Sequence, residues 1–228
     1  MRIIARVLAA IGFAAVLGTA TTALADFSAC ESALTTNDTK QQIALYTTCI
    51  TKGGLGIAER MGAFNNRGDA YQRLGEFDKA FNDFTWAIEA DPNWGVSYLN
   101  RAGIYARRGE WAKAVADLDK ATKLDPVRVR LPAYLEEAVI LATCPDPGVR
   151  DAHRALGLAQ KAVKMSDKAL ERSTLAMAYA SAGQLDDAVR EQVKAISLAG
   201  KETSPAELAD YQSRLDRYRK GIGSAEPQ

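Results

Sequence analysis

Apolar and small side chains recur along most of the chain at the spacing of helices that pack through one face. In residues 61–92 they form two such segments, separated by Gly75. Intervals of three and four residues place side chains on one side of a helix, and an isolated glycine between two helical segments marks a turn. The pattern therefore predicts two antiparallel helices. The positions that share a face are Phe64, Gly68 and Tyr71 in the first segment, and Ala80, Phe84 and Ala87 in the second.

This two-helix pattern returns after thirty-four residues. Residues 61–94 and 95–128 are identical at twelve aligned positions, whereas average residue usage gives about two or three identities by chance. Both units end in Asp-Pro, and the proline stops the second helix and turns the chain into the next unit. In the numbering of the first unit, the identical positions are Asn66, Arg67, Tyr71, Arg73, Gly75, Glu76, Lys79, Ala80, Asp83, Ala87, Asp91 and Pro92.

The two units resemble tetratricopeptide repeats, which are helix pairs with aromatic, Leu-Gly, Tyr, Ala, Phe and Pro positions at fixed offsets. The departures are Arg67 and Arg101, which stand where the repeat prefers leucine. We expect each arginine stem to pack between the helices while its head reaches water. The matching positions are Phe64, Gly68, Tyr71, Ala80, Phe84 and Pro92 in the first unit, and Tyr98, Ala102, Tyr105, Ala114, Leu118 and Pro126 in the second.

Two more units complete a predicted array over residues 61–202. Residues 169–202 fit the thirty-four-residue period, although two of their aromatic positions are polar. Residues 131–167 are off this period, and we interpret them as an irregular helix pair whose turn is lengthened at Pro145–Gly148.

The C-terminal part of the chain predicts a capping helix. The run LATCPDP and the segments after it, over residues 134–221, resemble a C-terminal arrangement of bacterial tetratricopeptide proteins. Ser204 and Glu207 have the spacing of a capping box, which opens a helix over residues 204–221. Residues 222–228 are expected to be a disordered tail. The predicted fold is all-α: a right-handed α-solenoid of antiparallel helix pairs closed by this capping helix.

Residues 1–25 have the layout of a secretory signal peptide. Basic residues precede an uncharged apolar run, which ends in the small-residue pattern Ala23-Leu24-Ala25. We expect cleavage before Asp26 and export, with a bacterial periplasm as the destination. An uncleaved membrane anchor and a lipoprotein acylated at Cys30 are the alternatives.

Residues 26–60 are predicted to form a partial helix hairpin closed by a disulfide. In an oxidising compartment three cysteines allow one bridge and leave one thiol. Cys30 and Cys49 lie on two adjacent helical segments and are the natural pair, which leaves Cys144 unpaired. Two buried free cysteines are the alternative.

The charge balance does not favour nucleic acid as a partner. The formal net charge is +1 over the full chain, and loss of Arg2 and Arg6 with the signal peptide makes it −1. After the signal peptide, the sequence has no second apolar run long enough to span a bilayer.

The sequence shows no set of residues typical of catalysis, a cofactor or a metal site. His153 is the only histidine, so Cys144 has no second histidine nearby to activate it, and there is no glycine-rich phosphate loop. We therefore predict a protein that is not an enzyme and binds no cofactor or metal. Adjacent acids on the predicted helices are interpreted as solvated faces: Glu136, Glu137, Asp186 and Asp187.

The candidate binding residues lie on the first helix of each unit. In tetratricopeptide arrays this helix lines the concave side, and the resemblance implies that Asn66 and Asn100 form an asparagine ladder against an extended peptide. Solvated asparagines with no such role are the alternative. The neighbours expected in the groove are Asn65, Asp69, Arg73, Leu99 and Arg107, with Gln72 and Met177.

These features predict a protein-interaction module of the bacterial cell envelope that binds a partner protein or peptide segment on its concave face. A carboxylate clamp for heat-shock chaperones is not expected, because Asn65 and Asp69 stand where that clamp has basic residues. The alternative function is an assembly subunit that docks through its outer face or its basic last helix. The basic residues of that helix are Arg214, Arg217, Arg219 and Lys220.

Overall fold

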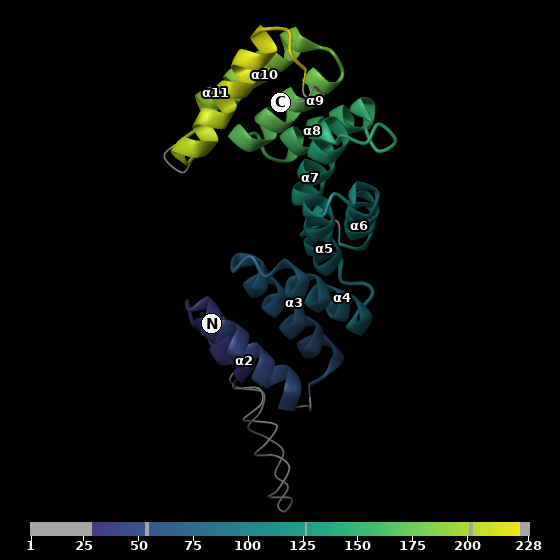
Figure 1. The fold of residues 1–228 in the computed structure, drawn as a ribbon, viewed down its shortest axis with the longest axis vertical. Coiled ribbons are helices and arrows are strands. Elements are labelled where there is room, and N and C mark those ends of the chain that lie inside the picture. The colour runs from purple at the N-terminus through teal and green to yellow at the C-terminus, as the bar shows by residue number, and fades with distance from the viewer. Residues whose placement is uncertain (1–28, 53–54, 126, 201–202, 224–228) are drawn as a thin grey trace, which may run out of the picture.

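The computed structural model describes residues 29–52, 55–125, 127–200 and 203–223, and every regular element within those ranges is an α-helix. The helices follow an arch whose two ends, α2 and α11, lie on the same side of the molecule (Figure 1). A helical stretch over residues 29–35 precedes them. The predicted all-α solenoid is therefore confirmed. The helices are α2 Thr39–Lys52, α3 Ile57–Arg73, α4 Phe77–Ala90, α5 Gly95–Arg107, α6 Trp111–Leu124, α7 Arg130–Thr143, α8 Ala152–Met165, α9 Ala169–Ser181, α10 Leu185–Leu198 and α11 Pro205–Arg219.

Each helix packs against the helices before and after it in the chain. The pairs are α3 with α4, α5 with α6, α7 with α8, and α9 with α10. In addition, α7 contacts both α5 and α9. The first helices α5, α7 and α9 therefore form a row in which each one contacts the next.

Three of the four pairs turn in the same way. Gly75, Gly109 and Gly183 have φ values of 76°, 72° and 75°, a region that glycine adopts without the strain of a Cβ atom. At each turn the amide of the residue after the glycine donates to a tyrosine carbonyl five positions earlier, at 2.9 Å. The recurring glycine thus ends the first helix and directs the chain into the second.

Small residues allow the two helices of a pair to approach closely. A Cβ atom at Gly68 would lie 2.7 Å from Cε1 of Phe84. Ala80, Ala102 and Ala114 are fully buried. A larger side chain at any of these positions would force the helices apart.

The irregular pair has a longer turn without a left-handed glycine. α7 ends at the buried free cysteine Cys144. Asp151 caps α8 by accepting a hydrogen bond from the amide of Arg154 at 2.9 Å, and its own amide donates to the carbonyl of Leu141 at 3.1 Å. These bonds fix the register of the second helix where the glycine turn is missing.

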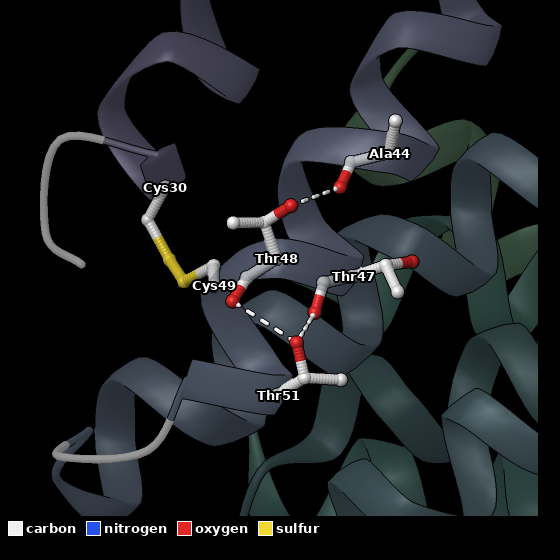
Figure 2. Close-up of a disulfide and its surroundings, with 6 residues drawn as sticks. All are labelled: Cys30, Ala44, Thr47, Thr48, Cys49 and Thr51. Atoms are coloured by element: carbon white, nitrogen blue, oxygen red, sulfur yellow. Dashed lines mark hydrogen bonds between the residues drawn. A yellow bond between two sulfur atoms is a disulfide. The ribbon is translucent and has the colours of Figure 1, made fainter. Parts of the chain in front are cut away.

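The N-terminal hairpin is closed by the predicted disulfide. Cys30 and Cys49 are bonded, with their Cα atoms 5.6 Å apart (Figure 2). In α2, the hydroxyls of Thr48 and Thr51 donate to the carbonyl oxygens of Ala44 and Thr47 at 3.0 and 2.8 Å. These two threonine hydroxyls therefore find their hydrogen-bond acceptors within the helix itself. The expected signal peptide lies outside the described residues.

The last helix begins with the predicted capping box. Ser204 Oγ accepts from the amide of Glu207 at 3.2 Å, and Glu207 Oε2 accepts from the amide of Ser204 at 2.8 Å. After the helix, the amide of Ile222 donates to the carbonyl of Arg217 at 3.0 Å. The start of the expected tail is thus bonded to α11, and residues 224–228 lie outside the description.

Candidate partner-binding face

The first helices face the hollow of the arch. Figure 1 shows α4 and α6 on the outside of the curve and α3 and α5 nearer the hollow. We use the name inner face for a set of residues on the first helices, chosen by their places in the repeat and by the contacts that join α3 to α5 and α5 to α7. The set is Asn65, Asn66, Asp69, Leu99, Asn100, Gly103 and Glu136.

Asn65 and Asn100 join α3 to α5 across the inner face. The Asn100 Nδ2 atom donates to Oδ1 of Asn65 at 3.2 Å, and Ser97 Oγ donates to the same oxygen at 3.2 Å. Asn66 turns toward α2, where its side chain hydrogen-bonds Tyr46; burial raises the pKa of that tyrosine. Asn66 was the predicted neighbour of Asn100, but the hydrogen bond of Asn100 is with Asn65, the residue before Asn66 in the chain.

The two equivalent arginines at the ends of α3 and α5 are held differently. Arg73 forms an ion pair with Asp69, and its Nη2 donates to Oε1 of Gln42 in α2 at 2.5 Å. Arg107 lies over the ring of Phe77, 4.0 Å from the ring centre. Both arginines are exposed, each in the last turn of its helix.

Glu136 occupies the third place in the asparagine series. α7 aligns with α5 at an offset of thirty-six residues, which matches Tyr98 with Tyr134, Ala102 with Ala138 and Ile104 with Ile140. The same offset places Glu136 where α5 carries Asn100 and α3 carries Asn66. This residue was expected on a solvated face, and that prediction was wrong.

The surroundings of Glu136 explain why its pKa is raised. Its Oε1 atom lies 3.4 Å from the position that a Cβ atom at Gly103 would occupy. Burial raises the pKa of Glu136 to about 7, and no charged group of the described residues contributes to that shift. A mostly buried carboxyl group without an ionic partner therefore lies between α5 and α7.

Arg67 and Arg101 are not solvated as expected, because each is paired with an aspartate of the second helix. Arg67 donates from Nε and Nη2 to Asp83, both at 2.8 Å, and Arg101 donates to Asp117 at 2.8 and 3.0 Å. Arg67 is only 8% exposed and Asp83 only 1%. Burial raises the pKa of Asp83, and the bidentate pair with Arg67 opposes that effect. Both arginines recur with their aspartates at the same separation in the two units, which is a signal the sequence did contain.

Glu137 reverses this charge pattern in the irregular pair. It aligns with Arg101, is buried, and pairs with Arg154 of α8, whose Nη2 also donates to Asp119 of α6 at 2.8 Å. Burial raises the pKa of Glu137 to about 7, although the nearby Arg154 acts to lower it. The expectation of a solvated Glu137 was therefore also wrong.

The capping helix covers the side of α9 that would continue the inner face. Arg214 of α11 donates to Ser173 Oγ at 3.3 Å and to Sδ of Met177 at 3.1 Å, both on α9. It also pairs with Asp210 at 2.5 Å. The open part of the inner face thus runs from α3 to α7.

The remaining chemistry of the described residues is sparse. They contain no group of three or more His, Cys, Asp or Glu side chains that could hold a metal ion. None of the helices in the described ranges has the length and apolar character needed to cross a membrane. His153 is exposed and Cys144 is buried.

The comparisons with known proteins agree with this architecture. Family models of the tetratricopeptide repeat match residues 63–93 and 96–128. No curated protein sequence matches the chain.

Three solved structures share the fold. A thermophilic tetratricopeptide repeat protein of Thermus thermophilus is 18% identical, with a TM-score of 0.61, over 83% of this chain and 98% of that one. A tetratricopeptide repeat protein of Parabacteroides merdae is 16% identical, with a TM-score of 0.65, over 91% and 82%. The MamA protein of Desulfovibrio magneticus is 14% identical, with a TM-score of 0.65, over 80% and 98%. Residues 63–93 and 96–128 are therefore two tetratricopeptide repeats, and they lie inside a solenoid of helix pairs.

Proposed function

We propose that this protein is a non-catalytic interaction module that binds an extended segment of a partner protein along its inner face. Asn66 and Asn100 make the polar contacts. The residues that border them are Asn65, Asp69, Arg73, Leu99 and Arg107.

The hydrogen-bonding capacity left at Asn100 carries this proposal. A carboxamide has two donor protons and one acceptor oxygen. Asn100 uses one proton on Asn65, and its Oδ1 has no hydrogen-bond partner within the described ranges. An extended peptide offers an amide and a carbonyl per residue, so it can complete both sides of such a group. Repeat arrays use their extended concave surfaces in this way.

A crosslinked pull-down tests the proposal. The purified protein serves as bait for an extract of the cells that make it, beside a variant with Asn66→Ala and Asn100→Ala. The matched control carries Asn82→Ala and Asn93→Ala, which remove two exposed asparagines of α4 and the turn after it. We expect a partner that the first variant loses and the control retains. A partner retained by both variants would contradict binding at the inner face.

We also propose export, with the bacterial periplasm as the site of action. The signal-peptide layout of residues 1–25 supports it, and so does the Cys30–Cys49 bridge, since disulfides persist in oxidising compartments. The test is the intact mass of the protein recovered from the periplasmic fraction, which should correspond to a chain beginning at Asp26.

A hollow on another side of the array supports assembly through the outer face as the second candidate. It has a volume of about 610 Å³ and lies between the end of α2, the start of α3 and the end of α4. Ile57 and Trp86 line it and are 71% and 45% exposed. Under this alternative, Trp86→Ala would abolish capture of the partner and the asparagine variant would not.

A further inference from the structure

We propose that Glu136 receives a lysine or arginine side chain of the bound polypeptide, so that the inner face selects a cationic residue beside the main chain that Asn66 and Asn100 hold. This inference depends on the proposed function, because it names the chemistry of the segment bound there.

Glu136 takes the third place in the row of first-helix residues. It follows Asn66 and Asn100 at the equivalent position of the next unit. A carboxamide can donate to a peptide carbonyl and accept from a peptide amide, whereas an ionised carboxylate only accepts. The third place in the row therefore cannot repeat the two-sided contact of the first two. It calls for a ligand group that only donates.

α5 presents to Glu136 none of the polar side chains that α3 presents to Asn100. Beside Asn100, α3 supplies the oxygen of Asn65. The α5 residue that aligns with Asn65 is Leu99, which has no polar atom in its side chain, and the one that aligns with Asp69 is Gly103. Glu136 thus lacks the partner that the same geometry gives Asn100.

Gly103 leaves free space beside Glu136. Within 4 Å, a Cβ atom at this glycine would meet only the Oε1 atom of Glu136. A bare helix surface therefore lies directly beside the carboxylate. A long, thin side chain with a cationic end can lie along such a surface and bring its charge to the carboxylate.

A cation satisfies this site better than a neutral donor. A mostly buried carboxylate has lost part of its hydration, and hydrogen bonds from charged donors are about twice as strong as neutral ones. The charged groups of nearby helices are engaged elsewhere: Arg101 with Asp117, and Arg154 with Glu137 and Asp119. The charge of Glu136 is left for the ligand.

The site should depend on pH between 6 and 8. Only the ionised carboxyl binds a cation with full strength, and burial raises the pKa of Glu136 to about 7. In the described residues, no charged or titratable group of α5, α6, α8 or α9 contributes to this shift. Affinity for a cationic segment should therefore rise by up to about tenfold from pH 6 to pH 8.

The test uses a panel of extended twelve-residue peptides of random sequence, screened for binding to the purified protein at pH 8. Each peptide retained is then remade with acetyl-lysine for lysine and citrulline for arginine, which remove the charge and keep the aliphatic stem. Dissociation constants are measured for the native protein, for Glu136→Gln and for Glu89→Gln. The last variant removes an exposed carboxylate of α4 as a matched control.

We expect that neutralising one basic residue of each retained peptide lowers its affinity about tenfold or more, both for the native protein and for Glu89→Gln. With Glu136→Gln, neutralising that residue should change the affinity less than twofold. Filling the space with Gly103→Ala should also weaken the basic peptides and leave their neutralised forms unchanged.

Two results would overturn the inference. If peptides bind, lose affinity with Asn66→Ala and Asn100→Ala, and yet show no dependence on charge at Glu136, the inner face is the binding site and this inference is wrong. If the native protein retains no peptide better than the asparagine variant does, the proposed function and the inference fall together.

Discussion

Replacing Glu136 by glutamine should stabilise the protein at pH 8 and leave its stability at pH 4 unchanged. Burial raises the pKa of this carboxyl from an ordinary value of 4.5 to about 7. Each pKa unit corresponds to about 1.4 kcal/mol, so ionising Glu136 in the folded state costs up to about 3 kcal/mol at pH 8. Partial contact with water lowers this to about 1–3 kcal/mol.

The sign of this pH dependence follows from the protons that the folded and unfolded states bind. Between pH 4.5 and 7 the folded state holds the proton of Glu136 and the unfolded state releases it. The free energy of unfolding of the native protein therefore falls as the pH rises through this window. Glutamine resembles the protonated carboxyl and does not titrate, so the two proteins are equal at pH 4 and diverge up to pH 8. A residue kept at a cost to stability is what a ligand-binding position predicts.

Urea denaturation followed by circular dichroism, at unit steps from pH 4 to pH 8, measures this difference directly. Glu89→Gln is the control and should follow the native protein at every pH, since Glu89 is exposed. An equal gain at pH 4 and pH 8 would show that the effect is not ionisation. A loss of stability at pH 8 would show that the carboxylate already has a favourable partner.

Three further predictions concern the scaffold. Ala80→Leu should overpack α3 against α4 and lower the free energy of unfolding by about 1–3 kcal/mol; an unchanged thermal midpoint would refute the close approach at this fully buried alanine. Asp83→Ala leaves the charge of Arg67 buried and unpaired and should cost about 3–5 kcal/mol in urea denaturation, while the double change Arg67→Met with Asp83→Leu should restore much of this loss. Reduction of the Cys30–Cys49 bridge should lower the free energy of unfolding by about 3 kcal/mol, and the melting temperature with it. Three free thiols, found by mass in the recovered native protein, would contradict this prediction.

The helix pairs could be predicted because their causes are local. Gly75 and Gly109 supply the left-handed turn, and small residues such as Ala80 mark where the backbones approach. These requirements recur in each regular unit, so the period shows them directly.

The buried ion pairs were missed because Arg67 and Arg101 were considered only as departures from the leucine that the repeat family prefers at this position. Arg67 and Asp83 recur together as Arg101 and Asp117, but pairing depends on how the second helix is rotated against the first. The sequence shows that both residues repeat and does not show that they meet.

The two acids of α7 were misjudged for a different reason. Successive residues of a helix point about 100° apart, and adjacent acids on a surface helix usually share a solvated side. α7 has neighbours on several sides, since α5, α6, α8 and α9 all contact it. Glu136 therefore faces α5 while Glu137 faces α8, and neither has the fully solvated surroundings that were expected.

Photo-crosslinking in the producing cells tests most directly whether the inner face holds a partner. Benzoylphenylalanine is placed at Asp69, which is exposed on the inner face, or at Ala116, which is exposed on α6. We expect a crosslinked partner from position 69, lost when Asn66→Ala and Asn100→Ala are added, and none from position 116. Crosslinks that form only from position 116 would place the binding surface on the outside of the arch and contradict binding at the inner face.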